Sequence, residues 1–256
     1  MKKISRRSFL AAAAVSAAAL ALTACGGSAS TASSAAASSV AASSEAASTS
    51  AAAAELTTVE AGKLTMATNA TFPPYEMTTD AGTIEGIDVD TAQAIAEKLG
   101  LELQIDDMDF DAALLSVQQG KADIAMAGIT VTDERMAVMS FSDSYATGIQ
   151  SVIVPEGSDI TSVDDLAGKK IGTQRGTTGY LYCSDDFGED AVVAYDNGLT
   201  AVQALNNGQV DAVVIDNEPA KAYVESNPGL KILDTSYAEE DYAIGMNKSN
   251  TALLEA

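Results

Sequence analysis

The chain has 256 residues, and its 36 Asp and Glu against 14 Lys and Arg give a formal charge of −22. An acidic chain repels phosphate backbones and anionic lipid surfaces, so we expect neither nucleic-acid binding nor peripheral membrane binding. The sequence contains no His, which excludes Ser-His-Asp and Cys-His catalysis and His-based metal sites, and we expect no cofactor and no metal.

Residues 1–24 are predicted to be an export signal that is cleaved. Four basic residues lie among the first seven, and an apolar run rich in Ala and Leu follows. This run has 16 residues, from 9 to 24, which is short for a helix that stays across a bilayer. Residues 5–10, Ser-Arg-Arg-Ser-Phe-Leu, resemble a twin-arginine export motif, so this route and the general secretory route both remain open.

The segment Leu22-Thr23-Ala24-Cys25 resembles the lipobox of bacterial lipoproteins, in which the Cys is lipidated and becomes the new N-terminus. The alternative is an ordinary cleavage site that happens to precede a Cys. Two acyl chains on Cys25 would anchor the protein durably to the outer face of the cell membrane. Residues 25–60 are then the lipidated Cys and a disordered tether, because their Ala- and Ser-rich composition offers few large apolar groups.

From residue 63 onward, short β-rich runs alternate with helical periodicity, which predicts parallel sheets flanked by helices. The first series comprises a strand at 63–68, a helix at 89–99, a strand at 101–105, a helix at 111–119 and a strand at 123–127. The second series comprises strands at 152–154, 170–173, 191–195, 212–215 and 230–233, with helices at 162–167, 178–184, 199–207 and 217–225.

The two series contain similar segments. Residues 110–128 and 198–216 each read as a helix, a Gly, an Asp and an apolar strand, and matched positions lie 88 residues apart. This constant offset favours two lobes of like construction. Gly128 and Asp216 each follow the end of a strand, where ligands of open parallel sheets bind. We therefore expect both residues to face one cleft between the lobes.

A free amino acid is a zwitterion, so a closed site for it needs a cation for the carboxylate and an anion for the ammonium group. The planar fork of Arg135 suits a carboxylate, and Asp216 suits an ammonium group. The alternative for residues 127–135 is a capping motif, in which Thr132 caps a short helix and Arg135 is a surface charge.

Six motifs resemble the amino-acid family of type II periplasmic binding proteins, the solute-binding proteins of ATP-driven (ABC) importers. They occur in family order between residues 67 and 244, which is essentially the whole folded part. The motifs are ATNATFPPYE at 67–76, GIDVD at 86–90, MDF at 108–110, AGITVTDER at 127–135 with FSDSY at 141–145, GTQRGTTG at 172–179, and DAVVID at 211–216.

The resemblance implies roles for the residues around the zwitterion. Arg135 holds the ligand carboxylate, helped by the backbone N–H groups of Thr130 and Thr178. Asp216 takes the ammonium group, together with the carbonyl of Gly128 and the hydroxyl of Thr130.

Around the ligand side chain, the resemblance implies that Phe72 and Phe110 enclose the apolar stem between two rings. Both could instead be core residues. Asn69 stands where several relatives that bind cationic amino acids or glutamine carry Asp, and Gln174 stands where the glutamine-binding relative has a basic residue. These two amides favour a polar neutral side chain or cystine. The positive charge of Arg175 keeps an acidic amino acid as an alternative ligand.

The loop that carries Gln174 also supplies Thr177 as a predicted ligand-binding residue. Cys183, the one thiol left once Cys25 is lipidated, is predicted to be a small buried apolar residue. Residues 250–256 begin a helical pattern and stop where the family has roughly two more helices, so the C-terminus is expected to be truncated.

We therefore expect a two-lobed α/β fold of the type II periplasmic-binding-protein class, each lobe a mainly parallel sheet flanked by helices. Lobe 1 comprises residues 61–147 and 241–256, lobe 2 comprises residues 148–240, and two hinge strands cross near 145–149 and 238–242.

The expected function is capture of a free amino acid, by a monomer, for a membrane permease with a cytoplasmic ATPase. One alternative is a dehydratase-like enzyme on the same fold, for which Glu76 is the obvious acid. The other is an amino-acid sensor or surface interaction protein that uses the same cleft.

Overall fold

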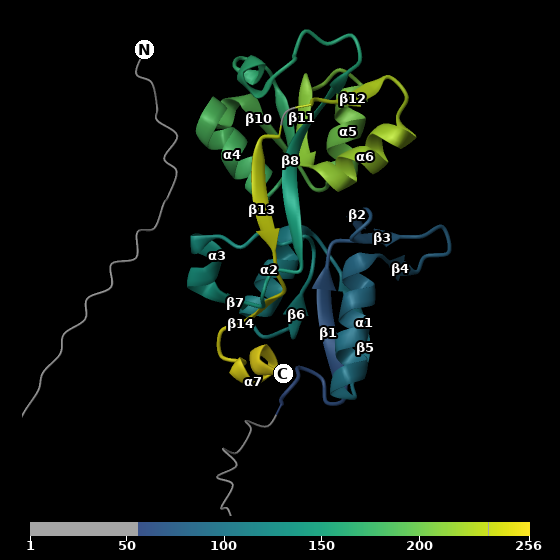
Figure 1. Cartoon of the computed structure of the whole chain (residues 1–256), viewed down its shortest axis with the longest axis vertical. Helices are drawn as coiled ribbons and strands as arrows, with labels where there is room; N and C mark the ends of the chain where they lie inside the picture. Colours follow the sequence, from purple (N-terminus) through teal and green to yellow (C-terminus); the bar gives the residue numbers. More distant parts are fainter. Residues whose placement is uncertain (1–55, 235) are drawn as a thin grey trace, which may run out of the picture. The chain divides into compact units, whose positions relative to one another are not determined.

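The computed structural model describes residues 56–234 and 236–256 (Figure 1). The predicted signal, the lipidation site at Cys25 and most of the predicted tether lie outside the described residues. Residues 56–60 of that tether contact the first sheet, because the Val59 N–H donates to Asp123 Oδ1 at 2.7 Å and Leu56 packs against buried apolar residues. Within the described part of the chain, no helix has the length and apolar character needed to cross a bilayer.

The first sheet is built from the N-terminal half of the chain and a late strand. Its spatial order is β5 (Glu102–Asp107), β1 (Lys63–Thr68), β6 (Ile124–Ala125), β14 (Gly245–Asn247) and β7 (Met139–Phe141). Its helices are α1 (Ile87–Leu99), α2 (Phe110–Gln118), α3 (Asp133–Val138) and α7 (Thr251–Glu255). A small antiparallel sheet that the periodicity did not predict adds β2 (Thr71–Phe72), β3 (Glu76–Thr78) and β4 (Ile84–Glu85).

The second sheet has the spatial order β10 (Val192–Tyr195), β9 (Ile171–Gln174), β11 (Ala212–Asp216), β8 (Ala146–Pro155) and β12 (Leu230–Ile232), with β13 (Ala238–Tyr242) also paired to β8. Its helices are α4 (Thr178–Phe187), α5 (Gly198–Asn206) and α6 (Asn217–Ser226), with the 3-10 turns η1 (Val163–Leu166) and η2 (Glu189–Ala191). Cys183 of α4 is fully buried among apolar residues, which confirms its predicted environment.

Parallel pairing is confined to one part of each sheet. The strands β5, β1 and β6 are parallel, and so are β10, β9 and β11. The strands β14, β7, β8, β12 and β13 make antiparallel pairs. Each sheet is therefore more mixed than the mainly parallel sheet that we expected. The strand–helix–strand units produce the parallel part, whereas the connections between the two sheets enter them in the opposite direction.

Two strands carry the chain between the sheets. The chain leaves the first sheet after β7 and enters the second through β8, and it returns through β13 to β14. Residues 146–150 of β8 pair antiparallel with residues 238–242 of β13, and Figure 1 shows the two strands side by side. These are the segments in which the two hinge strands were expected.

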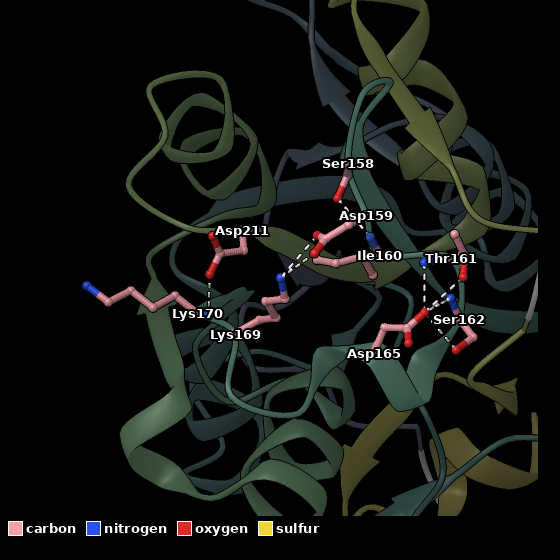
Figure 2. A network of polar contacts seen from close by, with 9 residues as sticks. All are labelled: Ser158, Asp159, Ile160, Thr161, Ser162, Asp165, Lys169, Lys170 and Asp211. Carbon is pink, nitrogen blue, oxygen red and sulfur yellow. Dashed lines mark hydrogen bonds and ion pairs between the residues drawn. The ribbon is translucent and has the colours of Figure 1, made fainter.

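The Asp of each repeated segment stabilises the amino-terminal edge of its sheet. Asp123 Oδ2 accepts a hydrogen bond from the Thr65 N–H at 2.8 Å, and Asp211 Oδ2 accepts one from the Lys170 N–H at 2.8 Å. Figure 2 shows Asp211 in a polar network with the neighbouring Lys169–Asp159 ion pair of 3.1 Å. These Asp residues therefore have a structural role at the edge opposite the strand ends that are expected to bind ligand.

The Figure 2 network also contains the turn before η1. Asp165 Oδ2 accepts hydrogen bonds from the backbone N–H groups of Thr161 and Ser162, at 2.9 and 3.0 Å. The Ser162 hydroxyl completes a capping box with Asp165. The helix predicted at 162–167 is therefore a 3-10 turn that begins at a Ser162 cap.

Candidate ligand-binding site

All ten residues predicted to bind ligand line one pocket. They come from both sheets: Asn69, Phe72, Phe110, Gly128, Thr130 and Arg135 from segments around the first, and Gln174, Thr177, Thr178 and Asp216 from the second. Five further lining residues were not predicted as ligand-binding, namely Glu76, Ala127, Gln150, Val214 and Ile215.

Arg135 points from a capped helix turn into this pocket. The Thr132 side chain caps α3 by accepting a hydrogen bond from the Arg135 N–H at 3.2 Å. The guanidinium donates through Nη1 to the Thr130 carbonyl at 2.8 Å and through Nη2 to the Gly176 carbonyl at 3.2 Å. Burial lowers the pKa of Arg135, while the nearby carboxylate of Glu240 acts in the opposite direction. The capping motif and the pocket position therefore coexist.

Asp216 places a buried carboxylate at the end of β11. The Gln150 side chain donates to Asp216 Oδ2 at 2.7 Å, whereas Oδ1 is buried without a hydrogen-bond partner. Burial raises the pKa of Asp216 to about 7, and the charge of Glu240 adds to this effect. An ammonium group beside Oδ1 would supply both the missing donor and the missing positive charge.

Gln150 and Glu240 are site residues that the sequence reasoning missed. Gln150 lies opposite Asp216 in the antiparallel pairing of β8 with β11, and its Nε2 also donates to Glu240 Oε2 at 2.9 Å. Both side chains are buried. The predicted parallel pattern contained no signal for this contact, because only the antiparallel entry of β8 brings Gln150 beside Asp216.

Gly128 lies where the backbone must approach a ring. Its φ is +54°, and an added Cβ would lie 2.7 Å from Phe72 Cε1. Its N–H donates to Asp88 Oδ2 at 3.3 Å. A side chain is therefore disfavoured both by backbone conformation and by space. This explains physically why a Gly stands at this end of the pocket.

Threonines from the two sheets meet across the pocket. The Thr130 and Thr178 hydroxyl oxygens are 3.4 Å apart. Thr177 caps α4 by accepting from the Tyr180 N–H at 3.3 Å, and its hydroxyl donates to the Gln174 carbonyl at 2.8 Å. The N-terminus of α4, which favours anions, therefore opens on the same pocket as Arg135.

Two amides define another side of the pocket. Gln174 Nε2 donates to Asn69 Oδ1 at 2.9 Å, and the Thr71 hydroxyl donates to the same oxygen at 3.0 Å. Asn69 Nδ2 donates to the Met108 carbonyl at 2.9 Å. Asn69 is thus held on three sides.

Phe72 and Phe110 are both buried, and they belong to different apolar clusters. The Phe72 ring stacks on Tyr75 with centroids 5.8 Å apart, and the Arg135 Cζ lies 5.3 Å from the Phe110 ring centroid. Each ring is at once part of a core and part of the pocket wall. Enclosure of a ligand stem between them stays a prediction.

Glu76 forms a buried acidic pair with Asp88. Glu76 is fully buried and lines the pocket, and its carboxyl group meets that of Asp88 but no N–H or cationic donor. Burial and the neighbouring Asp88 raise the pKa of Glu76 well above its usual range. Asp88 Oδ2 accepts from the Tyr145 hydroxyl at 3.0 Å, and burial raises its pKa to about 6.

Arg175, whose positive charge kept an acidic amino acid as an alternative ligand, lies outside this pocket. Its side chain is 58% exposed, with Asp196 Oδ1 3.9 Å from Nη2. Among the residues that line the pocket in the described part of the chain, Arg135 is the one cation. The pocket therefore offers no second positive charge to an acidic side chain.

Comparison with known proteins gives a consistent family. Residues 64–256 match the model of the bacterial extracellular solute-binding proteins, family 3. The probable histidine-binding protein of Neisseria gonorrhoeae is 33% identical over 196 residues, covering 74% of this chain and 73% of the relative. The putative ABC transporter arginine-binding protein 2 of Escherichia coli K12 is 31% identical over 205 residues, covering 78% and 84%.

The solved structures agree with these relatives. The arginine-bound form of the truncated arginine-binding protein ArgBP from T. maritima superposes with a TM-score of 0.72 at 40% identity, covering 76% of this chain and 92% of that one. Two sheets joined by β8 and β13, and a pocket lined from both, accord with the expected two-lobed periplasmic-binding-protein fold. The chain belongs to the bacterial extracellular solute-binding proteins of family 3.

Proposed function

We propose that this chain captures a free amino acid in the pocket between its sheets and delivers it to the permease of an ABC importer. The observation that carries the proposal is that the cation Arg135 and the buried carboxylate of Asp216, which has an oxygen without a hydrogen bond of ordinary geometry, lie in the wall of the same pocket. The relatives that are named for binding histidine or arginine support it.

The carboxylate end of the ligand would lie against Arg135 and the start of α4. The guanidinium is fixed by the Thr130 and Gly176 carbonyls, so its orientation does not depend on the ligand. The first N–H groups of α4, at Thr178 and beyond, can donate to a carboxylate without breaking intrahelical bonds. Together they provide a charge and fixed donors.

The ammonium end would lie against Asp216. Its Oδ1 is the buried acceptor that lacks a donor, and the Gly128 carbonyl and Thr130 hydroxyl come from the opposite sheet. An ammonium group carries three N–H donors, which matches three acceptors. Because the contacts come from both sheets, the ligand would favour the closed arrangement of the pocket.

For the ligand side chain, the Asn69–Gln174 amide pair supports a polar neutral group or cystine. A second candidate is a ligand with a cationic side chain, which the surroundings of Glu76 favour. Glu76 is a pocket-lining carboxyl paired only with the carboxyl of Asp88, and a guanidinium would supply the cationic donor that this acidic pair lacks. The arginine bound to the structural neighbour agrees with this candidate.

A thermal-unfolding screen with the twenty amino acids and cystine tests the proposal. A ligand at about 100 times its dissociation constant should stabilise the protein by about 2.7 kcal/mol. Stabilisation by an amino acid but not by its decarboxylated amine is expected. If no amino acid shifts the transition, the proposed function is wrong.

Glu76→Gln separates the two ligand classes. If the side chain is cationic, this change should weaken arginine binding at least tenfold, because a charged hydrogen bond of about 1.5–3 kcal/mol is lost. If the side chain is neutral, glutamine binding should change much less. Isothermal titration with both ligands distinguishes the outcomes.

The enzyme alternative also centres on Glu76, which lies in the pocket wall. The family is one of solute-binding proteins, and we propose that this chain binds its ligand without transforming it. A dehydratase of this fold would act on a carboxylated ring, so a cyclohexadienyl substrate is the test compound. Mass spectrometry after its incubation with the protein is expected to show it unchanged. We also propose that the protein acts as a monomer tethered to the membrane through Cys25.

A further inference from the structure

Behind the ammonium end of the pocket lies a second carboxylate, Glu240, which does not line the pocket but contacts Gln150, which does. Gln150 Nε2 donates to Asp216 Oδ2 at 2.7 Å and to Glu240 Oε2 at 2.9 Å. One amide nitrogen therefore joins two carboxyl groups, one from β11 and one from β13. All three side chains are buried.

Each carboxyl group has a second oxygen that no amide or cation contacts. Asp216 Oδ1 and Glu240 Oε1 are buried and have no hydrogen bond of ordinary geometry, and the groups nearest to the two carboxyls are phenols, Tyr242 beside Asp216 and Tyr182 beside Glu240. Among the described residues, neither group forms an ion pair with Lys or Arg. Two desolvated negative charges held by one neutral amide repel each other, and a proton on Asp216 relieves the repulsion.

We propose that Asp216, joined through Gln150 to the neighbouring carboxylate of Glu240, holds a proton in the ligand-free protein and releases it to solvent when the ligand's ammonium group binds. This inference rests on the proposed function, because it takes the ammonium group to be bound by Asp216. The ammonium ion brings its own positive charge, so it replaces the proton without any covalent step.

The other titratable groups that face the pair do not carry this proton. Burial raises the pKa of Tyr75 to about 12 and raises the pKa of the other facing phenols further, so these groups are neutral near pH 7. Arg135 is cationic, and its guanidinium is held by two carbonyls. The groups that face the pair are Tyr75 from the segment between β2 and β3, Arg135 from α3, Tyr182 from α4 and Tyr242 from β13.

The sign of the pH dependence follows from the direction of the shift. Burial, with a contribution from Glu240, raises the pKa of Asp216 to about 7, so the ligand-free site carries its proton below that pH. The ammonium group favours the ionised form. Affinity should therefore weaken as pH falls below about 7, approaching tenfold per pH unit, and should level off near pH 8.

Glu240→Gln tests the pairing, because it keeps an oxygen that can accept from Gln150 while removing the charge. The midpoint of the affinity–pH curve should move to lower pH, since Asp216 then ionises more easily. The variant should be weaker than wild type by a larger factor at about pH 8 than at about pH 6, because the lost attraction counts most where Asp216 is ionised.

Glu239→Gln is the matched control, since Glu239 is an exposed neighbour on the same strand. It removes one charge from β13 and should leave the pH curve as in wild type. A merely structural role of Glu240 would weaken binding by the same factor at every pH.

The measurement is isothermal titration with L-arginine and L-glutamine at about pH 6 and about pH 8. Two buffers of different ionisation enthalpy report the protons released. Neither amino acid titrates in this range. Wild type should release close to one proton at the lower pH and almost none at the higher pH, and Glu240→Gln should release fewer.

Equal proton release by wild type and Glu240→Gln would overturn the inference, because the proton would then come from another group such as the Glu76–Asp88 pair. Absence of proton release from wild type would also overturn it, even if the variant does not fold. Both results leave the proposed function intact. If neither amino acid binds, the same titration is made with the amino acid that stabilises the protein most in the thermal-unfolding screen; if neither an amino acid nor cystine stabilises it, the ammonium site and the inference both fail.

Discussion

Gln174 donates from its side-chain Nε2 to Asn69 Oδ1 at 2.9 Å, across 105 positions of the sequence. Gln174 is the last residue of β9 and Asn69 follows β1, and each of these strands is the middle one of the three parallel strands of its sheet. Their amides thus join the two halves of the pocket directly. This contact makes Asn69 the position at which ligand preference is most open to change.

Asn69→Asp should shift preference toward cationic amino acids. A carboxylate at this position can still accept from Gln174 and Thr71, but it loses the donor to the Met108 carbonyl. The new negative charge in the pocket wall then favours a ligand with a cationic side chain. Titration calorimetry should show that the affinity for arginine, relative to the affinities for glutamine and cystine, rises by about tenfold or more. Asn206→Asp, on the exposed side of α5, should leave the rank order unchanged. An unchanged order for both variants would mean that Asn69 does not contact the ligand side chain.

Arg135→Ala should abolish most of the affinity for the amino acid. Breaking one partner of a buried pair costs about 3–5 kcal/mol, or roughly 100- to 1000-fold or more. The ligand-free protein should also lose about 1–3 kcal/mol of unfolding free energy, because the guanidinium bonds to Thr130 and Gly176 disappear. Calorimetric titration and denaturant unfolding measure the two effects.

The control for Arg135 is Arg175→Ala, which removes an exposed guanidinium outside the pocket. It should bind the amino acid almost as wild type does. Wild type should also reject the decarboxylated amine strongly, whereas Arg135→Ala should discriminate far less. Affinity of Arg135→Ala within threefold of wild type would show that Arg135 does not hold the carboxylate.

Gly128→Ala should impair both binding and stability. The added methyl group would lie 2.7 Å from Phe72 Cε1, and the backbone has a φ of +54°. Gly120→Ala is the matched control, because Gly120 has a φ of +68° with open space around its Cβ position. The control should lose about 1 kcal/mol from backbone strain alone. Gly128→Ala should lose more, and its ligand affinity should fall. Equal unfolding free energies of the two variants would contradict the steric account.

Cys25→Ala should release the protein from the membrane fraction. The expectation follows from Leu22-Thr23-Ala24-Cys25 and the Ala- and Ser-rich segment after it. Fractionation of cells expressing the full chain, with Cys183→Ala as the control for loss of a thiol, measures this. Equal retention of wild type and Cys25→Ala would rule out the lipid anchor.

Local patterns predicted the alternation of strands and helices and the positions of most elements. They succeeded because periodicity, capping residues and terminal Gly act over a few neighbouring positions, as Thr132 and Ser162 show. The small sheet of β2, β3 and β4 escaped this reasoning, because strands of two or three residues carry too little periodicity.

The sequence by itself predicted which residues would bind a zwitterion, because Gly128 and Asp216 stand at matched strand ends and Arg135 follows Gly128 within one motif; the structure brings all ten predicted residues to one pocket. The tertiary structure alone decided that Gln150 lies opposite Asp216, that Glu240 lies within reach of the same amide, and that Glu76 is buried beside Asp88. These contacts depend on strands that enter the sheets in reverse and on the register of their pairing. Residues 66 or 90 positions apart then become neighbours, and no local pattern specifies that proximity.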